Sequence, residues 1–227
     1  MLLASTPTRA QSPAPSTPGP FVVDIRGVTA GLPKAVAFHP LLPTGTLVPQ
    51  RGFGLGVGAH VYVASLGPAR VGIGVDVLRA RGKVSTPASA SSTSRTSTSS
   101  TTTLTGAPAS ALSAASRIDD ATTLTAVAPQ VSFSFGTGDG WSYLSAGYGA
   151  AQIRSAASGD GNAPIGGQTT VVQDGGRIAA INFGGGARWF TQGRMAVGFD
   201  LRFHRLASSD ARPSTRLIVL SIGVSVR

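Results

Sequence analysis

Residues 52–63 read GFGLGVGAHVYV, and this stretch decides the fold class. Glycines at 52, 54, 56 and 58 raise the question of a phosphate-binding loop. A dinucleotide fingerprint needs Gly-x-Gly-x-x-Gly before a helix, and a Walker loop needs Gly-Lys-Ser/Thr, so neither motif fits the strict alternation here. Every odd position from Phe53 to Val63 is apolar. A period of two therefore predicts a β-strand with one apolar and one nearly bare face.

The composition fits one charge-poor, glycine-rich domain. Only 12% of the 227 residues are charged, against a usual share of about 25%, and 30 are glycine. Glu is absent and Lys is rare, which disfavours exposed helices. The net charge of +10 comes from arginines scattered singly, without a basic run or an aromatic patch. We therefore expect no nucleic-acid partner, and the absence of cysteine excludes disulfides and thiolate sites.

The chain divides into eight segments of period two, joined by connections of alternating length. Three connections, 66–68, 137–140 and 191–193, have tight-hairpin chemistry, whereas three of the other four are long. Short turns at one end and long loops at the other are typical of outer-membrane barrels. The sequence thus predicts an all-β fold, an eight-stranded antiparallel up-and-down transmembrane β-barrel with periplasmic termini. The segments are 21–28, 52–65, 69–82, 127–136, 141–154, 177–190, 194–206 and 215–227.

Two regions fall outside this pattern. Residues 1–20 combine a short apolar start with a Pro/Ser/Thr-rich stretch, and we interpret them as the remnant of a signal peptide plus a flexible leader. Residues 21–227 would form the barrel. Within it, residues 83–126 are rich in Ser, Thr and Ala, and we expect a long, exposed low-complexity loop.

Alternation assigns a lipid face and a lumen face to the strands. One face is apolar and uncharged, while the other collects Gly, Ser and a few charges. The predicted lipid-facing residues are Phe53, Leu55, Val57, Val61, Val71, Ile73, Val75, Val131, Phe133, Phe183, Val197, Phe199, Leu201, Ile218, Leu220 and Ile222. The predicted polar network of the lumen is Asp24, Arg26, His60, Asp76, Gln130, Asn182, Arg188, Asp200, Arg202 and His204.

Buried charges must be paired, because an isolated ion out of water costs several kcal/mol or more. We therefore expect Asp24, Asp76 and Asp200 to bridge the interior arginines and to plug the narrow lumen. Aromatic residues near the strand ends predict interfacial girdles. At the short-turn end these are Phe21, Tyr62, Trp141, Tyr143, Trp189 and Phe190, and at the long-loop end Phe53 and Phe203.

This layout resembles the small outer-membrane barrels of the OmpA transmembrane-domain, OmpX and OmpW type, described as the "outer membrane protein beta-barrel" domain. The resemblance covers residues 20–227 and rests on architecture. It implies a porin-like monomer integral to a Gram-negative outer membrane, surrounded by outer-membrane lipid and lipopolysaccharide and inserted by the barrel assembly machinery, with no cofactor. Such barrels usually end in an aromatic residue, whereas this chain closes on Arg227.

Two alternatives remain at this point. FHRLASSD at 203–210 places His204 near Ser208, which allows a lipid-modifying barrel enzyme resembling the lipid A deacylases, although their His-x-Ser spacing is absent. The other alternative is a soluble secreted β-sandwich adhesin. His39 and His60 stand alone, so we expect no metal site. Among the roles of anchor, adhesin, resistance factor and narrow pore, the sequence does not choose, and the ligand of the external loops stays open.

Overall fold

The computed structural model describes residues 19–39, 42, 46–87, 117–136, 139–160, 168–192, 194–209 and 212–226. Residues 1–18 of the expected leader (1–20) and the centre of the low-complexity loop, 88–116, lie outside these residues. The described chain is almost wholly β-strand, with one short 3-10 helix, η1 (Val36–Phe38). Within it, no helix is long and apolar enough to cross a membrane.

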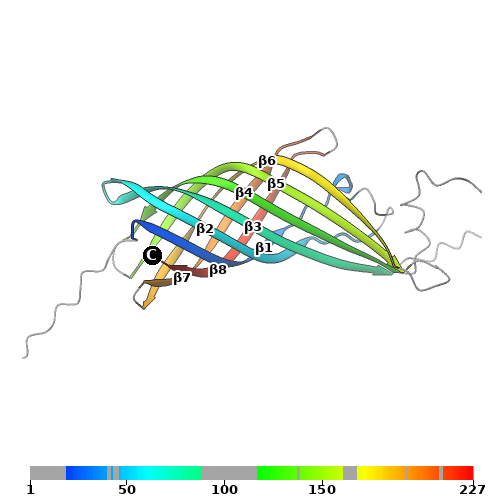
Figure 1. Cartoon of the computed structure of the whole chain (residues 1–227), viewed down its shortest axis with the longest axis horizontal. Helices are drawn as coiled ribbons and strands as arrows, with labels where there is room; N and C mark the ends of the chain where they lie inside the picture. Colours follow the sequence, from blue (N-terminus) through cyan, green and yellow to red (C-terminus); the bar gives the residue numbers. More distant parts are fainter. Residues whose placement is uncertain are drawn as a thin grey trace, which may run out of the picture.

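Eight antiparallel strands form one closed barrel, in which each strand pairs with the next and β1 pairs with β8 (Figure 1). The predicted fold class is therefore confirmed, and the sandwich alternative is wrong because a sandwich has open sheet edges. The strands are β1 (Phe21–Gly31), β2 (Arg51–Leu66), β3 (Ala69–Pro87), β4 (Arg117–Phe135), β5 (Gly140–Asp160), β6 (Gln168–Gln192), β7 (Met195–Leu206) and β8 (Thr215–Val226).

The connections alternate in length as predicted. At the β2–β3 turn, Gly67 has a φ of 59°, a left-handed conformation that glycine adopts without steric cost. The start of β1 and the end of β8 lie at the same end of the barrel as this short turn (Figure 1). We refer to this end as the short-turn end and to the opposite one as the long-loop end.

The four strands β3–β6 are longer than the alternation predicted. The expected loop 83–126 contributes residues 83–87 to β3 and residues 117–126 to β4, and residues 155–160 and 168–176 extend β5 and β6. The pairing register continues through these extensions, from Lys83 opposite Ala121 to Ala156 opposite Val172. The Ser/Thr/Ala composition of these extensions does not indicate strands strongly. Once a hydrogen-bonded ladder exists, however, adding further residue pairs to its end has a low entropic cost.

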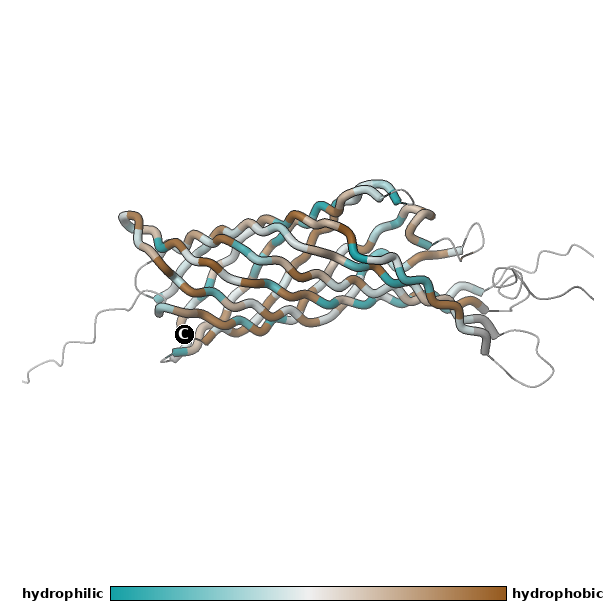
Figure 2. Tube along the Cα trace, turned by 45° about the horizontal axis from the view of Figure 1, so that its top comes forward, coloured by the Kyte–Doolittle hydropathy of each residue, from teal (hydrophilic) through white to brown (hydrophobic). Residues whose placement is uncertain are grey.

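The two faces of the strands exchange character along the barrel. At the short-turn end, apolar side chains point outward and polar ones inward, as on β3 where Val75 is exposed and Asp76 is buried. Toward the long-loop end the order reverses, since Leu78 and Ala80 are buried while Arg79 is exposed. Figure 2 shows that hydropathy alternates along the strands at both ends of the barrel.

The interior therefore consists of two layers. At the long-loop end, an apolar cluster with members on every strand except β2 fills the barrel, among them Leu78, Leu124 and Ile153. At the short-turn end, a smaller aromatic cluster of Val22, Tyr62, Trp141, Tyr143 and Ala196 lies inside. The charged residues of the lumen occupy strand positions between these two clusters.

Candidate functional site in the barrel lumen

The structure places all ten predicted lumen residues inside the barrel, each less than 5% exposed. Alternating glycines on the same face provide the space for them. A Cβ atom at Gly58 would lie 3.2 Å from Arg26 Nη2 and 3.4 Å from Asp24 Oδ2. The bare face of GFGLGVGAHVYV thus leaves room for side chains that β1 and β3 send across the lumen.

Among the aspartates of the lumen network, Asp200 on β7 has the most hydrogen-bond and ion-pair partners. Arg188 Nη2 lies 2.8 Å from Asp200 Oδ2, and Arg26 Nη1 lies 3.3 Å from the same oxygen. The hydroxyl groups of Tyr143 and Ser221 also donate to this carboxylate. Two cations and two neutral donors together satisfy a buried anion that alone would be costly.

The other two aspartates extend the network around the barrel. Asp76 on β3 pairs with Arg26, and Asp24 on β1 lies 3.3 Å from Arg188 Nε. Ser225 on β8 donates to Asp24 and also accepts from Arg188 Nε at 2.7 Å. Each of these two arginines bridges two carboxylates, so the network connects opposite walls of the lumen.

The contacts of Arg202 differ from the prediction that carboxylates bridge the interior arginines. Its Nη1 donates to Gln130 Oε1 at 3.1 Å, and Gln130 Nε2 donates to Asn182 Oδ1 at 3.2 Å. The guanidinium carbon also lies 6.0 Å from the ring centre of Tyr143, within the range of a cation–π interaction. An amide chain and an aromatic face thus replace a carboxylate partner.

The two lumen histidines lie apart from this ion-pair network. His60 lies 6.2 Å from the ring of Tyr143, and the Nε2 atoms of His60 and His204 have no hydrogen-bond partner among the described residues. His204 is buried, whereas Ser208 is exposed beyond the end of β7. The described residues show no hydrogen bond between them, and Asp210 lies outside the described residues.

Three aromatic residues predicted for the interfacial girdle lie inside the barrel. Tyr62, Trp141 and Tyr143 are 9%, 4% and 5% exposed. The girdle prediction is wrong for these three because their strand parity points them inward. The signal was available in the sequence: Trp141 and Tyr143 share the parity of Ser145 and Gly147, the small residues expected in a lumen.

A plug at the long-loop end escaped the sequence analysis. Phe38, at the end of η1, is 1% exposed and belongs to the apolar cluster inside the barrel. Ser155 on β5 donates to the Phe38 carbonyl at 2.9 Å, and the guanidinium of Arg212 stacks over the Phe38 ring at 5.6 Å. Residues 36–39, between β1 and β2, therefore fold back into the long-loop end of the barrel and place Phe38 inside it.

His39 anchors the same plug through both ring nitrogens. Nε2 donates to the Pro33 carbonyl at 2.9 Å, and Nδ1 lies 3.4 Å from Asp120 Oδ2 on β4. Burial acts to lower the pKa of His39, but the contacts with Asp120 and Pro33 outweigh it and raise this pKa above the usual value. This partner of His39 could not be found from the sequence, because Asp120 is 81 positions away and only the closed barrel brings the two together.

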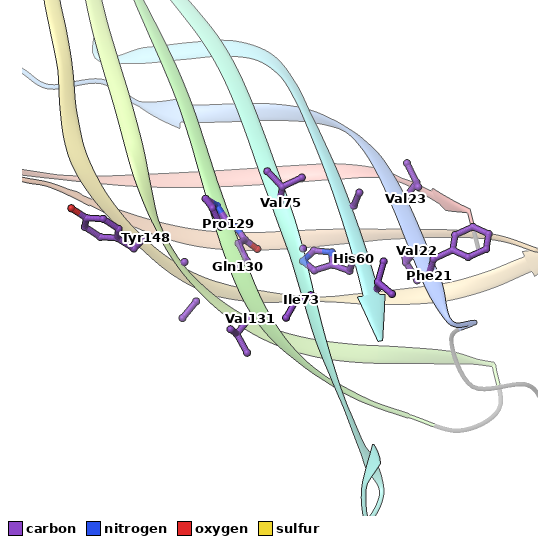
Figure 3. Close-up of a pocket in the computed structure, with 15 residues that line it drawn as sticks. Phe21, Val22, Val23, His60, Ile73, Val75, Pro129, Gln130, Val131 and Tyr148 are labelled. Carbon is purple, nitrogen blue, oxygen red and sulfur yellow. The ribbon is translucent and has the colours of Figure 1, made fainter. Parts of the chain in front are cut away.

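The outer face carries the predicted lipid-facing residues. Fifteen of the sixteen are at least 37% exposed, and Val71 is partly exposed. A groove of about 850 Å³ lies on this face. Figure 3 shows Pro129 and Tyr148 among the residues that line it. Most of its lining is apolar, including Phe21, Val23, Val61, Ile73, Val75 and Val131.

Comparisons with solved structures return membrane barrels of low sequence identity. Ail, the attachment invasion locus protein of Yersinia pestis, is 11% identical with a TM-score of 0.49, over 92% of this chain and 99% of its own. Neisserial surface protein A is 12% identical with a TM-score of 0.46, over 92% and 97%. The outer membrane protease OmpT of Escherichia coli is 9% identical with a TM-score of 0.45, over 98% and 99%. Neither a protein-family model nor a curated protein matches the sequence.

The class of protein follows from the molecule itself. The chain forms a closed eight-stranded ring with an uncharged apolar exterior over one half and charged residues paired inside. A soluble barrel has the opposite polarity, because its exterior must face water. The chain is thus a small β-barrel of the bacterial outer-membrane type.

Proposed function

We propose that the protein is a closed, non-enzymatic outer-membrane anchor that presents its long-loop end to the cell exterior for surface interactions. The observation that carries this proposal is the filled lumen. Ion pairs among Arg26, Arg188 and Asp200 occupy one layer, and the apolar cluster capped by Phe38 occupies the next. An eight-stranded barrel has an interior only wide enough for side chains, so the two layers in series oppose ion flow.

The polarity of the long-loop end supports the proposed orientation, in which this end faces the cell exterior. Above the apolar band, β3–β6 continue with polar side chains outward and apolar ones inward, which is the pattern of a water-exposed barrel. The described residues of the short-turn end show no comparable strand extension. Long loops and exposed strand extensions on the external side, with both termini in the periplasm, match the usual threading of such barrels.

Conductance across a planar bilayer tests the closed lumen. We expect wild-type protein to give no steady channel, and the double variant Phe38→Ala/Arg188→Ala to give small, frequent openings because both layers are removed. Stable wild-type channels would overturn the proposal. Recovery in the outer-membrane fraction and heat-modifiable migration on a denaturing gel would test membrane insertion separately.

The enzymatic alternative gains no support from the described geometry. A catalytic His–Ser pair needs the base within about 3 Å of the nucleophile, but His204 is buried and Ser208 is exposed. We therefore expect unchanged lipid A mass in cells that express the protein, and no difference between wild type and His204→Ala. A mass shift that His204→Ala abolishes would support the enzyme instead.

A further inference from the structure

Six of the eight strands carry an outward basic residue at the long-loop side of the apolar band. On β7, outward apolar residues run from Met195 to Phe203 and Arg205 follows, and on β3 they end at Val77 before Arg79. The remaining outward basic residues of this belt are Arg51, Arg81, Lys83, Arg154, Arg177 and Arg216. The belt lies where the polarity of the two strand faces reverses, which is the expected boundary between hydrocarbon and headgroups.

On β3–β6 the basic residues form two adjacent rows across four paired strands. The lower row reads Arg79, Thr125, Gln152 and Arg177. The upper row reads Arg81, Thr123, Arg154 and Asp174. We call the four arginines of these rows the arginine ladder.

One acidic residue, Asp174, compensates only one of the four arginines of the ladder. Arg154 Nη2 pairs with Asp174 Oδ2 at 2.8 Å, and Gln152 also donates to Asp174. Arg79, Arg81 and Arg177 make no ion pair with any residue in the described part of the chain. Three exposed guanidinium groups without a carboxylate partner thus lie in two adjacent rows of the same four paired strands, which favours binding of an anion on this face.

A groove runs from this ladder toward the middle of the membrane. Its volume is about 650 Å³, and Thr125, Gln152 and Arg177 line its polar end. Its other end is lined by Val127, Pro129 and Tyr148, with Gly149, Ala150 and Ala151 beside them. Pro129 and Tyr148 also line the groove of Figure 3, so the two depressions adjoin and lengthen the apolar path.

From this arrangement we propose that the face of β3–β6 holds one phosphorylated, acylated lipid of the outer leaflet, of the lipid A type. Its phosphate binds the arginine ladder, because guanidinium groups match phosphate oxygens in a two-pronged geometry. One acyl chain lies in the groove over Ala150, Tyr148 and Pro129. The proposal rests on the proposed membrane orientation, and it adds a specific lipid site to it.

A matched pair of variants tests the site. Arg79→Gln/Arg177→Gln removes the charge of Arg177, which lines the groove, and that of Arg79, which pairs with the lining residue Thr125. Arg205→Gln/Arg216→Gln removes two belt charges that face each other on β7 and β8, outside the groove lining. Native mass spectrometry of the folded barrel in nonionic detergent would measure binding of bisphosphorylated, hexa-acylated lipid A. We expect one lipid per wild-type barrel, affinity lowered about tenfold or more in the first variant, and nearly unchanged affinity in the second.

Two further measurements examine the acyl chain. Ala150→Trp keeps every arginine but fills the groove, so it should weaken lipid A binding. The bisphosphorylated glucosamine disaccharide without acyl chains should bind far more weakly than lipid A and equally to wild type and Ala150→Trp. Equal losses in both double variants, full binding by Ala150→Trp, or barrel dimers in place of lipid adducts would overturn the site. Heat-modifiable migration of each variant shows that the barrel is folded, and conductance and fractionation judge the proposed function independently.

Discussion

Arg188 and Asp200 form a buried ion pair across the β6–β7 interface, with Arg188 Nη2 2.8 Å from Asp200 Oδ2. Both side chains are at most 1% exposed, and Arg26 from β1 reaches the same carboxylate. Through ion pairs alone, one aspartate therefore connects β1, β6 and β7 from the inside, while backbone ladders connect neighbouring strands along the wall. The lumen network is therefore expected to act as an internal brace, in addition to its proposed role as a barrier.

Removal of the Asp200 carboxylate should destabilise the barrel strongly. Asp200→Ala leaves two buried guanidinium groups with fewer partners, and breaking a buried pair in this way costs about 3–5 kcal/mol. Urea titration of the refolded protein in detergent, followed by tryptophan fluorescence, measures the effect. Asp174→Ala is the control, because its ion pair with Arg154 is exposed and should leave the urea midpoint unchanged. Equal midpoints for the two variants would contradict the brace.

Alternation in the sequence was sufficient to predict the closed barrel and the facing of the lumen residues. Gly54, Gly56 and Gly58 mark the inner face because a barrel of eight strands has little interior volume, and the apolar partners mark the outer face. Asp76 and Asp200 could be placed inside by parity alone. Which arginine each would contact could not be predicted, since this depends on pairing registers around the whole ring.

Alternation could not predict the Phe38 plug or the reversal of polarity between the two strand faces. Phe38 stands in a segment without periodicity, and its burial depends on a cavity that eight separate strands create. On β4 and β5, Leu124 and Ile153 turn inward while their neighbours Thr125 and Arg154 turn outward. This pattern has the same period of two as the half of the barrel with an apolar exterior. Only the exchange of polar and apolar residues between the two faces marks the end of the apolar band.

An arginine in the apolar band should impair assembly. Val75 faces outward on β3 near the middle of the band, and Val75→Arg should cost about 2–4 kcal/mol because the charge must leave water. Val57→Arg on β2 should impair assembly to a similar extent. The measurement is the folded fraction after refolding into phospholipid vesicles, read as heat-modifiable migration. Thr29→Arg is the control, since Thr29 pairs with Phe53, which in turn pairs with Arg81 of the basic belt. Normal assembly of Val75→Arg would refute the assigned outer face.

The plug should loosen at high pH. Because folding raises the pKa of His39, protonated His39 stabilises the plug fully below the unfolded pKa of about 6.5, and this contribution is lost as the pH rises through the raised folded value. Asp120 supports the charge and Arg212 opposes it. Hydrogen-exchange protection factors of the Phe38 and His39 amides, which bond to Ala35 and Val36, report the closed plug.

We expect these protection factors to fall in the wild type as the pH rises from about 6.5 through the raised folded pKa of His39. Asp120→Asn removes the carboxylate that favours the charged ring, and His39→Gln removes the titrating group, so both variants should show a flat profile. Amides on β7, such as that of Phe199, serve as an internal control because they lie far from His39 in the fold. A flat wild-type profile would show that the His39–Asp120 contact does not control the plug.

Two glycines of the GFGLGVGAHVYV stretch should differ sharply in their tolerance of alanine. A Cβ at Gly54 would lie 1.9 Å from the Arg79 carbonyl oxygen and 2.7 Å from Ala80 Cα, which are backbone atoms of the neighbouring strand and cannot rotate away. At Gly56 the nearest atom is Val28 Cγ1 at 3.2 Å, in a side chain that can adjust. Gly54→Ala should therefore lower the free energy of unfolding by about 1–3 kcal/mol, the usual cost of overpacking, and Gly56→Ala by much less. Urea midpoints of the two single variants measure the difference, and equal shifts would show that β2 and β3 adapt more freely than their close spacing implies.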